Sequence, residues 1–174
     1  MTESEDYTKQ DLKKYYGKDN AFDFEYLLDD AYLNVAMLHV GCGSGEIMTK
    51  SREHWDGVDF NENLHYLWDE LDVSARTGDV RDMHWISPEQ YDYTFSVDFF
   101  EHLKPEDVPK VVAELTRVAP HGIHVIDRAP LSYFRGTGNK NLHPSGGLCG
   151  DEWLAHFPTH ATMTQTKRHV TIKW

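Results

Sequence analysis

The stretch LHVGCGSG, residues 38–45, decides the fold expected for this chain. It follows the apolar residues 35–37 and is typical of a buried strand that ends in a glycine-rich turn. Glycine adopts positive φ at little cost and lets a ligand approach bare backbone. A helix expected from about Glu46 to Arg52 would direct its first N–H groups at whatever fills the turn. By itself this pattern indicates an adenosine-containing cofactor without specifying which one.

The spacing of the glycines narrows the choice of cofactor. Gly41, Gly43 and Gly45 form G-x-G-x-G, and Glu46 stands where the third glycine of the dinucleotide fingerprint G-x-G-x-x-G would fall. The spacing therefore argues against a bound pyrophosphate.

An acidic residue follows at the end of the next expected strand. Asp59 lies within the short apolar run at residues 55–60. A carboxylate at such a strand end can accept both hydroxyls of a ribose, because the cofactor of a nucleotide-binding α/β sheet lies across these ends. The alternative is that Asp59 is a turn or N-cap residue before the helix that starts near Asn61.

Two further motifs follow in the chain. Gly78-Asp79-Val80 is the first, and YDYTFSVDFFEHL, residues 91–103, is the second. Taken with the glycine turn and Asp59, they resemble the class I S-adenosylmethionine-dependent methyltransferases, and best the small-molecule, methyltransferase type 11-like members. The resemblance runs from about Met37 to the C-terminus. His39 departs from it, because the family usually has an acidic residue at that place in the first strand, where it supports the loop.

The resemblance implies S-adenosylmethionine as the cofactor. It places Asp79 beside the adenine and matches residues 91–103 to the family's fourth strand with its D-x-x-E-H-L continuation. The residues expected to bind the cofactor are Gly41, Cys42, Gly43, Gly45, Asp59, Phe60, Asp79, Val80 and Asp98.

Hydrophobic periodicity predicts alternating strands and helices. Strands are expected at 37–41, 56–60, 75–79, 92–97 and 122–127, helices near 23–32 and at 46–53, 62–71 and 106–118, and a closing hairpin in the tail 159–174. This order predicts an α/β, Rossmann-like domain: a mostly parallel sheet with helices on both faces and a C-terminal antiparallel hairpin. Residues 1–174 are interpreted as one domain, in which 1–35 form a helical or flexible lead-in.

Composition restricts the partners. The net charge of −12 divides into −15 over residues 1–120 and +3 over 121–174. An acidic body repels phosphate backbones, so nucleic acid is not expected as a substrate. No apolar run suggests a membrane span or leader, and we expect a cytoplasmic protein without membrane contact. The two cysteines and the scattered histidines lack metal-ligand spacing, so no metal is expected. Nothing in the sequence indicates an oligomeric state.

Methyl transfer to a hydroxyl or a protonated amine requires a base that removes a proton. Histidine is suited to this at neutral pH, and His102 and His143 are the candidates. A helix-start histidine bonded to backbone is the alternative for His102.

The long glycine-rich segment 128–150 follows the fifth expected strand, and its residues Tyr133, Arg135 and Lys140 are candidates for binding the acceptor. Its basic side chains suggest a small acceptor that bears a carboxylate or phosphate. The alternative is a solvated connector.

The sequence thus predicts an S-adenosylmethionine-dependent methyltransferase that acts on a small-molecule or peptide-like acceptor. Two other functions stay open at this stage. One is a non-catalytic methyltransferase-like binding module or partner subunit, because cofactor motifs do not prove turnover. The other is a NAD-dependent oxidoreductase, which the missing third glycine disfavours.

Overall fold

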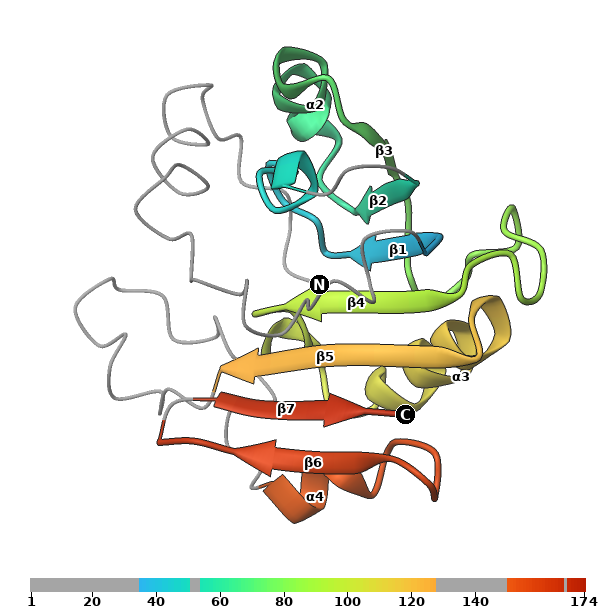
Figure 1. Ribbon diagram of the computed structural model, residues 1–174, viewed down its shortest axis with the longest axis vertical. Helices are drawn as coiled ribbons and strands as arrows, with labels where there is room; N and C mark the ends of the chain where they lie inside the picture. The colour runs from blue at the N-terminus through green and yellow to red at the C-terminus, as the bar shows by residue number, and fades with distance from the viewer. Residues whose placement is uncertain (1–34, 51–53, 128–149, 168) are drawn as a thin grey trace.

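A seven-stranded sheet forms the centre of the structure, a computed structural model that describes residues 35–50, 54–127, 150–167 and 169–174 (Figure 1). The strands are β1 (Met37–Val40), β2 (Trp55–Asp59), β3 (Ser74–Thr77), β4 (Tyr93–Val97), β5 (His121–Asp127), β6 (Thr162–Gln165) and β7 (His169–Lys173). Their order in the sheet is β3-β2-β1-β4-β5-β7-β6.

The first five strands are parallel. β1 pairs with β2 on one side and β4 on the other, β2 pairs with β3, and β4 pairs with β5. The tail then forms a hairpin in which β7 runs antiparallel to both β5 and β6. The predicted fold class is confirmed, including the closing hairpin. Because β1 and β4 are neighbours whose connections leave in opposite directions, the topological switch point, where such sheets bind ligands, lies at their carboxyl ends.

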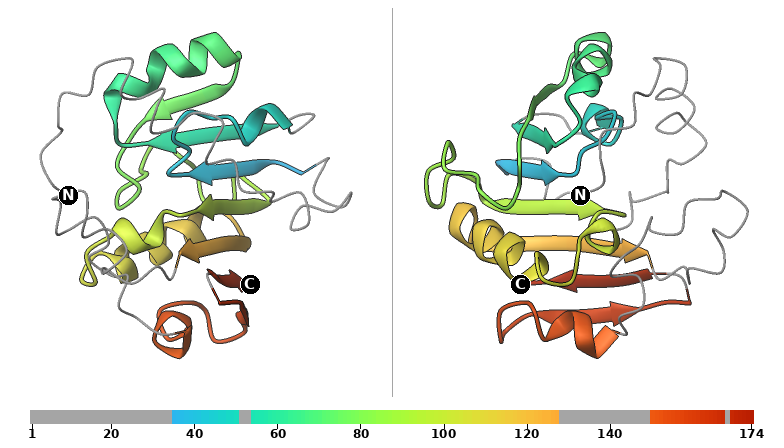
Figure 2. Two further views of the ribbon diagram at one scale, coloured as in Figure 1. Left: turned by 90° about the vertical axis from the view of Figure 1, so that its left-hand side faces the viewer. Right: turned by 180° about the vertical axis from the view of Figure 1, so that it is seen from behind.

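Helices cover both faces of the sheet, as predicted (Figure 2). They are η5 (Glu62–Leu64), which continues into α2 (His65–Leu71), then α3 (Val108–Val118) and α4 (Gly150–Leu154), with the short 3-10 helices η4 (Met48–Lys50) and η6 (Phe100–His102). Leu38 and Val40 of β1 join the core beneath α3 and α4, whereas Met37 joins the core beneath α2. Alternate residues of a strand point to opposite faces, so β1 is buried on both sides.

The sequence pattern of α3 explains where this helix forms. Pro109 lies in its first turn, where the missing N–H costs nothing, and the helix ends before Pro120. The residues that recur on its buried face are Val108, Val111, Val112, Leu115 and Val118. This apolar stripe packs α3 onto the sheet, close to the predicted range 106–118.

The helix predicted over 46–53 is wrong for the described residues, which form only the 3-10 turn η4. The backbone N–H of Met48 donates to Gly45 at 2.9 Å and that of Thr49 donates to Glu46 at 3.2 Å, both three residues back. The Thr49 hydroxyl also donates to the Glu46 carbonyl at 2.7 Å, so it competes with the bond of a regular helix. Residues 51–53 and the predicted helix at 23–32 lie outside the described residues. Helix α4 was not predicted.

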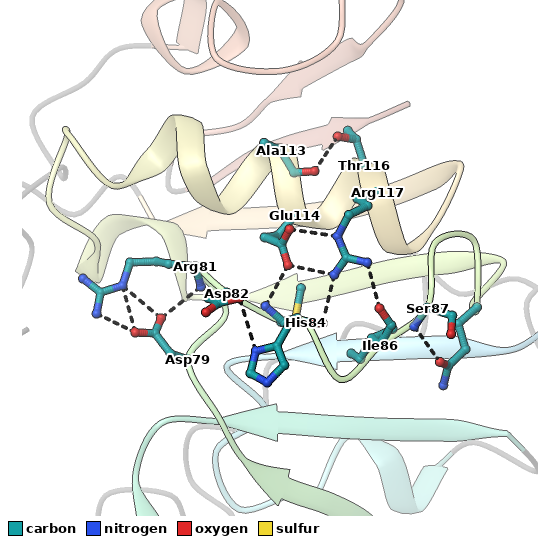
Figure 3. A network of polar contacts seen from close by, with 12 residues as sticks. Asp79, Arg81, Asp82, His84, Ile86, Ser87, Ala113, Glu114, Thr116 and Arg117 are labelled. Carbon is teal, nitrogen blue, oxygen red and sulfur yellow. Dashed lines mark hydrogen bonds and ion pairs between the residues drawn. The ribbon is translucent and has the colours of Figure 1, made fainter.

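The connection between β3 and β4 is bound to α3 by a polar network (Figure 3). The guanidinium of Arg117 donates to the carbonyls of Ile86 at 2.7 Å and Met83 at 2.9 Å, and it forms two bonds with Glu114. Glu114 in turn accepts the backbone N–H of Met83 at 2.7 Å. The hydrogen bonds from Arg117 hold the pKa of Glu114 below its usual value. This network fixes the segment that begins at Asp79.

Candidate cofactor site

The turn after β1 requires its glycines. Gly41, Gly43 and Gly45 have φ values of +64°, +53° and +85°, which L side chains adopt only with strain. A Cβ on Gly41 would also overlap the ring of Phe99, which follows β4. The glycine turn therefore packs directly against the segment after β4, at the switch point of the sheet.

Most backbone N–H groups of this turn are already used inside the protein. Gly41 and Cys42 donate to the Val58 carbonyl at 2.8 and 3.2 Å, Gly43 to the Asp59 carboxylate at 3.0 Å, Gly45 to the Cys42 carbonyl at 3.0 Å, and Glu46 to the Ser44 hydroxyl at 3.4 Å. These donors are occupied, and residues 48–50 form a 3-10 turn, so the described part of this segment does not present the helix N-terminus expected from the sequence. It is poorly suited to a phosphate group, which needs such donors.

Asp59 braces the turn from the end of β2. Its Oδ2 accepts the N–H of Gly43 and its Oδ1 accepts that of Asn61, each at 3.0 Å, and the residue is 7% exposed. Burial raises the pKa of Asp59, against the opposing effect of these backbone donors. The bond to Asn61 is the local turn contact considered as the alternative role. A carboxylate has about four acceptor positions, so both oxygens retain capacity for ribose hydroxyls, and ribose binding stays a prediction.

The neighbours of these residues divide into exposed and buried groups. Phe60, directly after Asp59, is 51% exposed and is the only large hydrophobic residue found exposed within the described ranges. The side chains of Cys42 and Val80 are buried. Burial, together with the negative charge of Asp59, raises the pKa of the Cys42 thiol.

Asp79 carries an ion pair. Arg81 donates from Nε to Oδ1 at 2.9 Å and from Nη2 to Oδ2 at 2.6 Å (Figure 3). Its third nitrogen, Nη1, reaches Asp107 at 3.2 Å. The Arg81 hydrogen bonds hold the pKa of Asp79 below its usual value. Asp79 is thus a fixed, ionised carboxylate two residues after β3, and its contact with adenine stays a prediction.

Acidic groups also gather where β4 and β5 end. Asp98 is exposed and has φ +50°, which directs the chain into η6. Glu101 is 0% exposed, and its Oε1 accepts the N–H of Asp127 at 3.2 Å. Burial and the nearby charges of Asp98 and Asp127 raise the pKa of Glu101 well above its usual value. This edge of the sheet is therefore acidic.

Of the predicted catalytic and acceptor-binding residues, the structure describes only His102. His102 lies on η6 with an exposed side chain, while the neighbouring Glu101 turns inward to bind β5. A catalytic role of His102 stays a prediction. His143, Tyr133, Arg135 and Lys140 lie outside the described residues.

Two residues at the site escaped the sequence analysis. The indole N–H of Trp68 on α2 donates to the Gly43 carbonyl at 2.8 Å. His169, at the start of β7, lies opposite Asp127 in the sheet, and its Nε2 is 3.9 Å from Oδ1 of Asp98. Trp68 belongs to an apolar helical stripe and His169 to an alternating strand, so both patterns indicate only burial.

The described residues contain neither a cluster of metal ligands nor a membrane-spanning helix. No three His, Cys, Asp or Glu side chains within them form a group suited to a metal ion. None of the helices in the same ranges has the length and apolar character needed to cross a bilayer.

Comparison with known proteins agrees with this fold. Residues 38–126, just over half of the chain, match the methyltransferase domain family. A search of curated protein sequences finds no match. Among solved structures, the chain is similar to a SAM-dependent methyltransferase from Aquifex aeolicus, with 18% identity, TM-score 0.67 and coverage of 96% of this chain and 97% of that one.

Two other solved structures resemble it to a similar degree. A TehB-like SAM-dependent methyltransferase from Corynebacterium glutamicum has 15% identity, TM-score 0.65 and coverage of 92% of this chain and 90% of that one. PigF with SAH has 16% identity and TM-score 0.64, over 86% of this chain and 52% of that one. The chain belongs to the methyltransferase domain family and has the fold of the class I S-adenosylmethionine-dependent methyltransferases.

Proposed function

We propose that this protein transfers a methyl group from S-adenosylmethionine to a small-molecule acceptor, and that the glycine turn, Asp59, Phe60, Asp79 and Asp98 bind the cofactor. Two observations together carry the proposal: the backbone donors of the glycine turn are occupied, and the neighbouring edge of the sheet is acidic. S-adenosylmethionine carries a sulfonium and an ammonium group and has no phosphate. The site therefore suits this cofactor better than NAD, whose pyrophosphate needs free N–H donors and is repelled by carboxylates.

The residues present fit the parts of the cofactor. Asp59 retains acceptor capacity for ribose hydroxyls, and exposed Phe60 provides an apolar surface beside it. When bound, S-adenosylmethionine supplies a methyl group that is already activated, so the protein has mainly to align the acceptor and exclude water. This explains why the site does not need an elaborate set of catalytic side chains.

Calorimetric titration with S-adenosylhomocysteine, S-adenosylmethionine and NAD tests the choice of cofactor. We expect both adenosyl ligands to bind and NAD to give no heat. Tight NAD binding without a response to either adenosyl ligand would overturn the proposal.

The role of Asp59 needs a sharper test, because the same carboxylate also braces Gly43. Hydrogen bonds to a charged group contribute about 1.5–3 kcal/mol each, so Asp59→Ala should weaken S-adenosylhomocysteine binding at least tenfold. The 2′-deoxy analogue of this ligand separates the two roles. The native protein should bind the 2′-deoxy analogue more weakly than S-adenosylhomocysteine, whereas Asp59→Ala should bind the two ligands about equally well. The control is Asp72→Asn, which changes an exposed carboxylate and should still prefer S-adenosylhomocysteine. If Asp59→Ala still prefers S-adenosylhomocysteine to the 2′-deoxy analogue as strongly as the native protein does, then Asp59 only holds Gly43 and does not bind the ribose.

We further propose that the acceptor is anionic and contacts Tyr133, Arg135 and Lys140, with His102 or His143 removing its proton. The support is the reversal of charge in residues 121–174 within an otherwise acidic chain. Replacing Arg135 and Lys140 together by glutamine should raise the KM for an anionic acceptor and leave the cofactor Kd unchanged. An unchanged acceptor KM would contradict this part of the proposal.

A further inference from the structure

One residue of the glycine turn, Gly43, is held through both of its backbone polar groups. The N–H of Gly43 donates to Oδ2 of Asp59 at 3.0 Å, and its carbonyl accepts the indole N–H of Trp68 at 2.8 Å. Asp59 ends β2 and Trp68 lies on the helix that follows, so both partners come from one βα unit. The two peptide units that flank Gly43 are therefore each held by a side chain of that βα unit.

Trp68 also limits the other end of the turn. A Cβ on Gly45 would lie 3.5 Å from Cδ1 of Trp68 and 2.7 Å from a methyl group of Val73. The carbonyl of Trp68 accepts the N–H of Val73 at 3.1 Å, which places that methyl group there. Trp68 itself is 4% exposed. One buried side chain thus contacts the turn at Gly43 by a hydrogen bond and bounds it at Gly45 by packing.

His39 does not support the glycine turn in the way that the sequence resemblance would suggest. It stands at the position in β1 where the resemblance leads us to expect an acidic side chain that supports the turn. In the part of the chain that the structure describes, Nδ1 of His39 is buried without a hydrogen-bond partner. Its ring instead packs edge-on against Trp55 and Phe95, which belong to the same core cluster as the buried residues of α2. The side chains that support the turn at Gly43 are those of Asp59 and Trp68.

We propose that Trp68 is a positioning residue for the cofactor: its indole N–H sets the orientation of the Gly43–Ser44 peptide and so the shape of the turn against which the cofactor lies. This inference rests on the proposed function. The ligand would meet the turn, and Trp68 would act through Gly43 without touching the ligand.

The test compares two tryptophan-to-phenylalanine variants that make the same chemical change. Trp68→Phe removes the N–H that binds Gly43. Trp55→Phe is the matched control, because Trp55 is also buried and its indole N–H has no acceptor among the described residues. Calorimetric titration with S-adenosylhomocysteine at 15 °C should give a Kd at least fivefold weaker for Trp68→Phe and within twofold of native for Trp55→Phe. Urea unfolding of both variants shows whether they are fully folded under the titration conditions.

A second readout uses the native protein and needs no folded variant. The indole cross-peak of Trp68 in a ¹H–¹⁵N spectrum should shift on addition of S-adenosylhomocysteine, while the cross-peak of Trp55 stays in place. The native protein failing to bind S-adenosylhomocysteine would overturn the proposed function. Normal binding with an unmoved Trp68 cross-peak, or with equal Kd values for the two folded variants, would overturn only the role of Trp68.

Discussion

The imidazole of His39 meets the ring of Phe95 edge-on, with ring centroids 5.1 Å apart and 61° between the planes. His39 is buried in β1, between β2 and β4, and burial lowers the pKa of its imidazole to about 3. The same holds for His124, whose pKa burial also lowers to about 3, with a smaller contribution from His39. The folded protein thus keeps two core histidines neutral.

Acid should destabilise the protein through these histidines. Their folded pKa values lie below the ordinary value of 6.5, so between about pH 6.5 and 3 the unfolded chain binds protons that the folded chain does not. Their contribution is present above pH 6.5 and is lost as the pH falls. His39→Leu should reduce the pH slope of the free energy of unfolding by about 1.4 kcal/mol per pH unit in this window.

Urea unfolding at pH 4.5, 5.5, 6.5 and 7.5 measures this slope. The exposed His84 provides the control, and His84→Leu should leave the slope close to that of the native protein. Equal slopes for the native protein and His39→Leu would contradict the buried neutral state of His39.

Glu101 should show the opposite pH dependence. Its folded pKa is raised, so above its ordinary value of 4.5 the unfolded chain releases a proton that the folded chain retains. This contribution is present below pH 4.5 and is lost as the pH rises toward the folded pKa. The neutral isostere in Glu101→Gln removes the effect. The stability of Glu101→Gln relative to the native protein should therefore increase by about 1.4 kcal/mol per pH unit above pH 5, until the folded pKa is reached.

Urea unfolding of the native protein and of Glu101→Gln at pH 5 and pH 8 measures how the difference in their stability changes with pH. The control is Glu106→Gln, which changes an exposed carboxylate five residues after Glu101, and its stability should show the pH dependence of the native protein. If Glu101→Gln keeps a constant difference from the native protein at both pH values, then Glu101 is ionised in the folded state.

Arg117 should contribute measurably to stability, because its guanidinium binds two backbone carbonyls and a carboxylate at once (Figure 3). Partial exposure of the side chain reduces the value of each bond, and we expect Arg117→Met to cost roughly 1–3 kcal/mol. Lys110→Met removes a more exposed ion pair, with 3.6 Å between Nζ and Asp107, and should cost less than about 0.5 kcal/mol. Urea midpoints at constant m-value measure both, and equal costs would mean that the network does not anchor the β3–β4 connection.

Gly41→Ala should distort the turn, because the added Cβ would overlap the ring of Phe99 at a positive φ. We expect a loss of roughly 1–3 kcal/mol in stability and at least a tenfold weaker Kd for S-adenosylhomocysteine. Removing the ring relieves the overlap but not the backbone strain. The double variant Gly41→Ala/Phe99→Ala should therefore be more stable than the sum of the two single changes predicts, by thermal or urea unfolding. Strict additivity would show that the two residues do not meet.

Local patterns in the sequence determined the elements of the fold. The apolar run before the glycines, the stripe of valines on α3 and the alternation of the tail each depend on residues within a few positions of one another. Such short-range periodicities predicted the parallel sheet, the closing hairpin and the glycine turn at the end of β1. They failed at η4, where a threonine hydroxyl and i+3 bonds replaced a regular helix, and they missed α4.

Only the tertiary structure decided which side chains meet at the site. Trp68 and Gly43 are 25 residues apart, and Glu101 and Asp127 are 26 apart, so their contacts depend on how whole elements pack. In sequence, Glu101 and His102 look alike as polar neighbours after β4, yet one is buried and the other exposed. The burial of a charged or polar group depends on neighbours from distant strands. The sequence by itself therefore determined the fold and the type of cofactor, while the packing of the sheet determined how the turn is supported and which acidic groups are buried.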